Sequence, residues 1–194
     1  MFPRRTGAPA ALPITLQECL THLRADADGG ANDLYINSLI PVAVAACEER
    51  INRTLISTAW RLQLDAFPAG GGEIALRMGP VMSVQSVTYK DAAGVVQTLD
   101  PSAYVLDGDS VPARLVPAVG TAWPATQDGA INAVTVTYTA GFGATAAAVP
   151  APIRHWLLLA VAEMYETRSA SAERPVVRNE FVDHLLAPYR VWEL

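Results

Sequence analysis

The sequence is poor in the residue types from which reactive sites are commonly built. Its 194 residues include two cysteines and three histidines. Cys19 and Cys47 fall on separate predicted helices, where small buried thiols are the ordinary expectation. His22, His155 and His184 are each isolated in the sequence and lack the spacing of a zinc-binding pair. We therefore expect no disulfide framework, no metal site and no cofactor.

Basic residues are outnumbered by acidic ones. The chain has 14 lysines and arginines against 19 carboxylates, a net charge of −5. A protein that grips duplex DNA normally presents a basic face, because its affinity comes largely from neutralising phosphates. The adjacent basic pair, Arg4 and Arg5, lies in a segment rich in proline, glycine and alanine. Two interpretations stay open for this pair: a flexible tail, or an arm that touches a partner or DNA.

Long apolar runs are also missing. The longest, residues 156–162, is far shorter than the roughly 20 residues that cross a bilayer. Arg4 and Arg5 are followed by Thr-Gly-Ala-Pro and not by the apolar core of a signal peptide. We expect a chain that is made in the cytosol and makes no contact with a membrane.

Material for a hydrophobic core is plentiful. Half of the chain is hydrophobic (51%) and 17% is charged, and the length suits one domain or one domain with a large insertion. The apolar excess leaves surface that subunit contacts could cover.

The first third of the sequence predicts two helices after a flexible arm. Residues 1–13 contain three prolines and show no periodicity. Residues 15–18 form a Thr-x-x-Glu capping box, which predicts the start of a helix at Thr15. The next helix should begin at Asn32 or Asp33, with a kink or a short first segment at Pro41. Its buried stripe is Ile36, Ile40, Val44, Cys47 and Ile51, and its polar far end is Glu48, Glu49, Arg50 and Arg53.

From Ser57 the apolar period changes from 3.6 to 2, which indicates strands. Short alternating segments are joined by turns that contain glycine or proline. The predicted strands are residues 60–64, 74–78, 84–89, 95–99, 104–106, 113–116 and 134–138. Such short strands favour an antiparallel sheet or a small barrel.

Helical periodicity returns near the end of the chain. One helix is expected over residues 153–165, and a last one from about Pro175 or Arg178 to Ala187, with Phe181, Leu185 and Leu186 inward. The sequence thus predicts an α+β fold, a small helical bundle with an inserted antiparallel sheet or barrel. Its parts are an arm (1–13), N-terminal helices (14–56), the β insertion (57–143) and C-terminal helices (144–194).

One segment matches a nucleotide-binding pattern. Residues 141–146, Gly-Phe-Gly-Ala-Thr-Ala, fit the dinucleotide motif and follow a strand. The motif works only if a helix begins inside it and points its amides at the pyrophosphate. Here the helix begins only after Pro150, so a glycine turn is the favoured interpretation. An enzyme that binds a nucleotide at this turn remains the alternative.

Other polar groups fit no catalytic or metal-binding pattern. Residues 26–30 and 107–109 look briefly like calcium loops but lack the required glycine and glutamate spacing, so we interpret both as turns. Asp183 and His184 could orient a base, yet no nucleophile elbow is present. Glu163 and Glu166 are expected to be solvated. We expect no catalytic residues.

Tryptophan marks a candidate contact. Trp60, Trp123 and Trp156 suit a core, whereas Trp192 follows the last helix and a proline. A tryptophan there is hard to bury in its own domain, and aromatic anchors dominate protein interfaces. Trp192 is therefore a candidate to dock on a neighbouring subunit, although packing within its own subunit stays open.

Several segments, taken in order, resemble the head–tail connector (neck adaptor) family of tailed bacteriophages. The similar segments are the second helix, which ends in residues 47–53, and residues 60–68, 79–91, 114–115, 123–124, 136–143, 149–153 and 185–191. The likeness as a whole covers about residues 14–191.

The resemblance implies a homo-oligomeric ring of about a dozen subunits below the portal protein of a phage or prophage. Such a ring extends the DNA channel, lets DNA pass without sequence-specific binding, and docks the next neck or tail-completion protein. It would be made in the bacterial cytoplasm and reside in the virion neck. The candidate contact residues are Trp192, Tyr189, Arg190, Arg4 and Arg5. A monomeric ligand-binding module is a further alternative and predicts one apolar pocket among the strands.

Overall fold

The computed structural model describes residues 2–167, 182 and 184–192, and the chain divides into two compact units. Residues 1–9 and 57–142 form the β unit, and residues 10–56 and 143–194 form the helical unit. The described residues contain three α-helices and two antiparallel sheets, of five and three strands. The predicted α+β class is confirmed. The alternative of a small barrel is wrong, because each sheet keeps two free edges.

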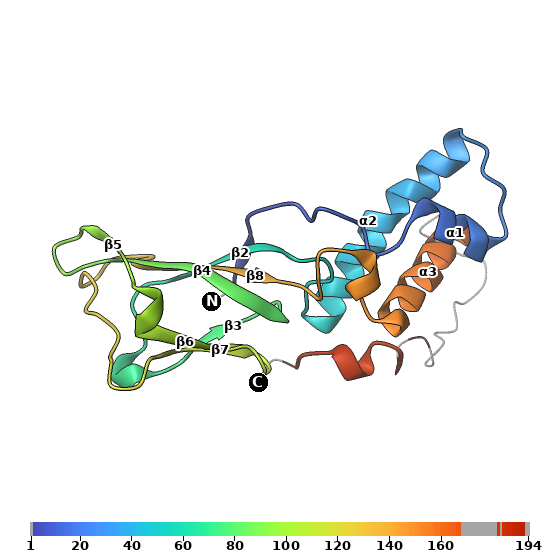
Figure 1. The fold of residues 1–194 in the computed structure, drawn as a ribbon. Helices are drawn as coiled ribbons and strands as arrows, with labels where there is room; N and C mark the ends of the chain where they lie inside the picture. Colours follow the sequence, from blue (N-terminus) through green and yellow to red (C-terminus); the bar gives the residue numbers. More distant parts are fainter. Residues whose placement is uncertain (1, 168–181, 183, 193–194) are drawn as a thin grey trace. The chain divides into compact units, whose positions relative to one another are not determined.

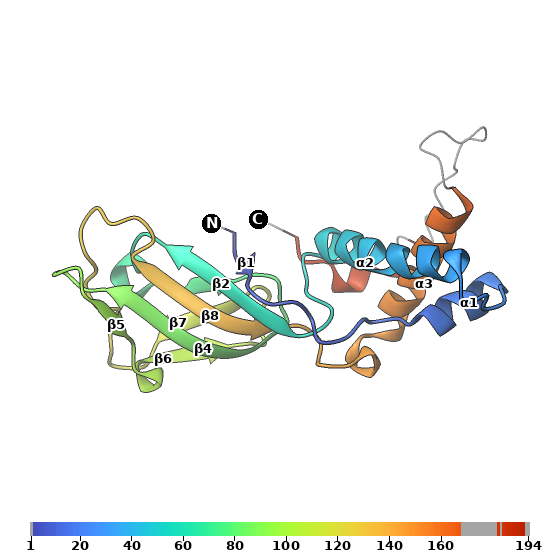
Figure 2. The ribbon, with the colours of Figure 1, turned by 90° about the horizontal axis from the view of Figure 1, so that it is seen from above.

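The larger sheet has the strand order β1-β2-β8-β4-β5, and the smaller has the order β3-β7-β6 (Figures 1 and 2). All neighbouring strands are antiparallel. The strands of the larger sheet are β1 (Arg4–Arg5), β2 (Thr58–Leu64), β8 (Val134–Ala140), β4 (Val81–Lys90) and β5 (Val96–Thr98). Those of the smaller are β3 (Ile74–Leu76), β7 (Ala113–Pro117) and β6 (Tyr104–Asp107).

Strand β8 shows how the alternating sequence becomes a core. Val134, Val136 and Tyr138 are fully buried, and the threonines between them lie on the opposite face of the sheet. The buried side chains of β2, β4 and β8 pack against those of β3 and β7, so the core of the β unit lies between its two sheets. The hydroxyl of Tyr138 donates to the carbonyl of Arg77 at 2.8 Å, and burial raises the pKa of this phenol.

The N-terminal residues differ from the expected flexible arm. Arg4 lies opposite Arg61 and Arg5 opposite Trp60, so that these residues form β1 at the edge of the larger sheet. Thr6 extends the pairing by donating its backbone N–H to the carbonyl of Ala59 at 2.9 Å. Backbone pairing of this kind leaves no apolar periodicity in the sequence.

The helical unit contains α1 (Leu16–Leu23), α2 (Ala31–Ile51) and α3 (Ala151–Glu166). The predicted capping box is confirmed, because Thr15 and Glu18 exchange side-chain and backbone hydrogen bonds. Helix α2 is a single element that continues through Pro41.

Helix α3 packs against both α1 and α2. Its Arg154 donates from Nε to the carbonyl of Pro13 at 3.1 Å and forms an ion pair with Glu18. At its other end, the hydroxyl of Tyr165 donates to Oδ1 of Asn32 at 2.9 Å. These contacts hold the start of α1 and the start of α2 on α3.

The predicted last helix lies mostly outside the described residues, as does its Phe181. Of its other two predicted core residues, Leu186 is buried and Leu185 is half-buried. The chain then forms a 3-10 turn, η4 (Ala187–Tyr189), and continues in extended form through Arg190.

Candidate interaction surface at the end of the second helix

The end of α2 holds the C-terminal segment of the chain through three hydrogen bonds. Asn52 caps α2 in the left-handed conformation (φ 53°) and donates from Nδ2 to the carbonyl of Val191 at 2.9 Å. The N–H of Val191 donates to the carbonyl of Ile51 at 3.0 Å. Arg53 donates from Nε to the carbonyl of Tyr189 at 2.7 Å. Residues 189–191 are thereby fixed to the helix end by their backbone, with Arg190 exposed and Tyr189 and Val191 half-buried.

Two charged residues near this segment, Arg53 and Glu48, are affected by burial. Partial desolvation of the guanidinium lowers the pKa of Arg53. Glu48, which the sequence places at a polar helix end, is in fact buried, and its Oε1 accepts the backbone N–H of Leu55 at 2.8 Å. The carboxylate of Glu48 therefore supports the turn that follows α2, because a buried N–H needs an acceptor.

The held segment presents an aromatic ring to solvent. The guanidinium of Arg190 lies 4.0 Å from the centroid of the Trp192 ring, and Trp192 is 68% exposed. Cation–π stacking restrains both side chains without hiding the ring. Two of the sequence-predicted contact residues, Arg190 and Trp192, thus form one surface, which we call the C-terminal contact surface, and the half-buried Tyr189 adjoins it in the chain.

The other two predicted contact residues belong to the β unit. Arg4 is exposed and lies beside Arg61 in the strand register, where two like charges face each other. Arg5 is also exposed, and its guanidinium lies 5.0 Å from the centroid of the Trp60 ring. No periodicity in the sequence signals either cross-strand neighbour, because β1 contains two residues, both arginine.

The glycines of residues 141–146 have structural reasons to be present. Gly141 has φ 143°, a conformation that side chains disfavour. A Cβ on Gly143 would lie 2.4 Å from the Cβ of Ala148. Only a 3-10 turn of three residues, η3 (Ala146–Ala148), begins at the end of this segment, and α3 begins later, at Ala151, so no α-helix points its amides into the segment.

In the two acidic loops, residues 26–30 and 107–109, the aspartates accept hydrogen bonds from nearby residues. Asp28 accepts the N–H of Gly30 at 2.8 Å, and Asp33 accepts that of Gly29 at 2.9 Å. Asp107 accepts hydrogen bonds from Ser110 and Arg114. No cluster of three or more potential metal ligands occurs among the described residues.

Two histidines that are far apart in sequence are neighbours in the fold. His22 of α1 and His155 of α3 have ring centroids 5.9 Å apart in an edge-to-face arrangement. Packing of α1 on α3 brings them together, and no sequence spacing could indicate it. His184 is exposed, whereas Asp183, its predicted orienting partner, lies outside the described residues. Glu163 and Glu166 are exposed, as expected.

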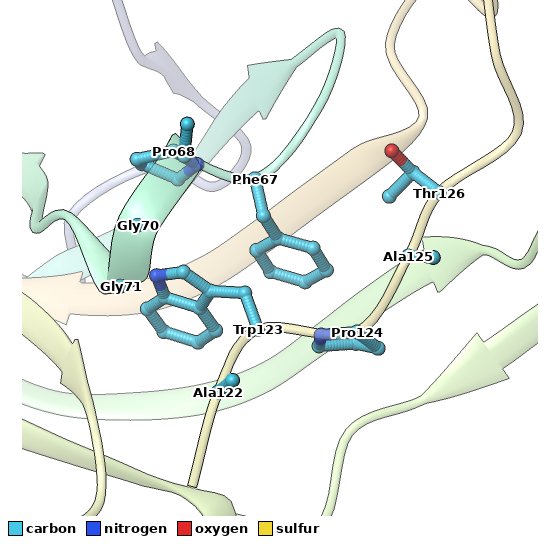
Figure 3. A pocket seen from close by; sticks show the side chains of 10 residues that line it. Phe67, Pro68, Gly70, Gly71, Ala122, Trp123, Pro124, Ala125 and Thr126 are labelled. Atoms are coloured by element: carbon cyan, nitrogen blue, oxygen red, sulfur yellow. The ribbon is translucent and has the colours of Figure 1, made fainter.

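An open hollow of about 360 Å³ lies between two loops of the β unit, residues 67–71 and 122–126 (Figure 3). The rings of Phe67 and Trp123 stack there at 4.9 Å with an interplanar angle of 6°. The indole Nε1 of Trp123 donates to the carbonyl of Gly72 at 2.8 Å. The two rings stack on each other, and the indole N–H already donates a hydrogen bond. The hollow therefore offers a ligand little beyond loop backbone.

The described part of the chain contains no helix that is both long and apolar enough to span a membrane. No protein-family model matches the sequence, and no curated protein matches it either.

Solved structures, in contrast, match along the whole chain. A chain in the neck of an empty gene transfer agent particle with C6 symmetry has a TM-score of 0.81 at 29% identity, covering 100% of this chain and 97% of the other. A chain of a native gene transfer agent virion has a TM-score of 0.80 at 28% identity with the same coverage. A chain of a native neck with C12 symmetry has a TM-score of 0.74 at 29% identity, again with 100% and 97% coverage. These full-length matches confirm the predicted resemblance to head–tail connectors and the predicted role of a structural neck protein in a phage-like particle.

Proposed function

We propose that the chain assembles into a closed ring of about a dozen subunits at the neck of its particle. The single observation that carries the proposal is the full-length match, at a TM-score of 0.81 and 29% identity, to a chain of a symmetric neck. Such a ring sits below the portal protein, extends its channel and offers a surface to the next neck or tail-completion protein.

The C-terminal contact surface is the candidate site for one of these partners. Exposed tryptophan and arginine are the residue types enriched at the energetic centres of interfaces. Trp192 is 68% exposed although three hydrogen bonds to the backbone hold the residues beside it. A restrained exposed ring loses little conformational entropy when a partner covers it. Arg4 and Arg5 are the second candidate contact, on the edge strand β1.

The charge of the chain suits passage of DNA without tight binding. A net charge of −5 gives an assembled ring a strongly negative total. Phosphates are repelled by negative surfaces, so DNA would slide through such a channel and not be gripped. In this role the chain is a structural component and not an enzyme.

Native mass tests the proposal. Light scattering or native mass spectrometry across a concentration series should give one discrete species of about a dozen copies, alone or after portal protein is added. A chain that stays monomeric at every concentration, with and without portal, would contradict the ring. A Trp192→Ala variant should still form the ring if this residue contacts a different neck protein, and should lose it if it contacts a second copy.

A further inference from the structure

Helix α2 has an apolar outer face as well as an apolar inner one. Its inner face, including Ile36, Ile40 and Cys47, is buried in the helical unit. On the opposite side lie Leu34, Asn37, Ser38, Pro41, Val42 and Ala45, all exposed, which we call the outer strip. Leu34 is 72% exposed and Val42 is 53% exposed. The 3.6-residue period places these six positions on one side of the helix, turned away from the buried stripe.

The outer strip carries no charge along its length. A helix that faces water on one side usually has charged residues there. The neighbouring helix α3 follows this rule, because its exposed positions include His155, Glu163 and Glu166. In α2 the first exposed charge after Leu34 is Glu49, one turn beyond the strip. A helix that is apolar on both sides is usually buried on both sides. The composition of α2 therefore indicates that its outer strip is covered as well.

The few polar atoms of the strip are compatible with burial. The hydroxyl of Ser38 already donates to the carbonyl of Tyr35 at 2.6 Å, so covering it leaves no donor unsatisfied. Pro41 has no N–H, so the carbonyl of Asn37 lacks its helical donor. That carbonyl and the Asn37 amide are polar anchors that a covering partner could satisfy. Pro41 and Ala45 are compact, which lets another helix approach closely.

We infer that the outer strip is covered by a second copy of this chain and forms the apolar centre of the contact between ring neighbours. This inference rests on the proposed ring. A closed ring requires every subunit to bury the same two surfaces against its neighbours, whereas a portal or tail partner contacts only one rim. The strip is roughly 18 Å long, so it can supply the centre of an interface of about 800 Å² per partner but not the whole of it.

The test replaces two strip residues by glutamate, as L34E/V42E. Glutamate is a good helix former, so the helix persists, but two carboxylates would have to be desolvated to close the contact. The matched control is V119E/I131E, which changes two exposed apolar residues of the β unit (104% and 76% exposed). We expect wild type and control to form the same ring. L34E/V42E should be monomeric, with an association constant weakened by at least about 100-fold. Its melting temperature should equal that of wild type when both are measured at a dilution where wild type is also monomeric.

Other outcomes would overturn the inference. If L34E/V42E forms the ring like wild type, the strip is outside the contact, and the ring itself still stands. If L34E/V42E melts several degrees below wild type at a dilution where both chains are monomeric, the strip is covered within its own chain.

A photo-crosslinking residue at position 42, with one at position 119 as control, tests the contact at the outer strip independently of the proposed closed ring. Chain-to-chain products from position 42 alone support the inference even if no closed ring is seen by mass. Absence of such products at the highest concentration overturns it, whatever the native mass shows.

Discussion

The Nε of Arg53 lies 2.7 Å from the carbonyl oxygen of Tyr189, a hydrogen bond between residues 136 positions apart in the chain. It ties the end of α2 to the segment that displays Trp192. Because the donor is charged and partly desolvated, the bond is stronger than a neutral one on the surface.

Replacing Arg53 by alanine should therefore loosen the C-terminal contact surface. We expect the free energy of unfolding to fall by about 1.5–3 kcal/mol, since a hydrogen bond from a charged group is lost. Trypsin should also cleave after Arg190 faster than in wild type. Urea unfolding and timed digestion measure the two effects. Arg53→Lys keeps the charge and a donor, so it should recover part of both; an R53A variant that matches wild type would show that Asn52 and Ile51 suffice.

Substitution of Gly143 should destabilise the fold, because its position leaves no room for a side chain. A Cβ there would lie 2.4 Å from the Cβ of Ala148. Gly143→Ala should lower the free energy of unfolding by about 1–3 kcal/mol through overpacking. Adding Ala148→Gly removes the opposing atom and should restore much of the loss. Thermal unfolding of the two single variants and the double variant measures this coupling; purely additive effects would argue against a direct clash.

The lowered pKa of Asp107 should make the stability of the protein depend on pH in the acidic range. Hydrogen bonds from the Ser110 hydroxyl, and then from Arg114, lower the pKa of this carboxyl from 3.8 to about 2. A lowered pKa means that the folded state favours the ionised form, so the stabilisation is complete above about pH 4 and is lost as the pH falls towards 2. Urea unfolding between pH 5 and pH 2 should show a shallower decline in Asp107→Asn than in wild type. The neighbouring Asp109→Asn is the control and should follow wild type, and equal slopes for all three chains would contradict the assignment.

The two thiols should be inert in the folded protein. Burial raises the pKa of Cys19 to about 11 and that of Cys47 to about 12, and thiolates are the reactive form. A raised pKa means that the stabilisation from keeping these thiols neutral is present below pH 9 and declines as the pH rises above it. At pH 8 an aromatic disulfide reagent should label both cysteines only after urea is added. Fast labelling of the native chain would contradict their burial.

Much of the local structure was predictable because it follows local patterns. The alternation of Val134, Val136 and Tyr138 predicts a strand with one buried face, and β8 has that form. The capping box at Thr15 and Glu18 marks the start of α1 correctly. All seven predicted strands are present. The strand that was missed, β1, consists of two arginines paired with β2, and an apolar period cannot indicate such a strand.

The candidate contact surface was predictable only in part. The position of Trp192 after the predicted last helix marks it as a candidate contact residue, but the support of residues 189–191 by Asn52 and Arg53 joins residues far apart in sequence. The buried carboxylate of Glu48 and the pairing of His22 with His155 likewise arise only when the helices pack. Periodicity and turn chemistry act over a few residues, so the sequence determined most of the elements and their order. The tertiary structure alone decided which distant groups meet, because packing between elements, and not propensity within them, brings those groups within bonding distance.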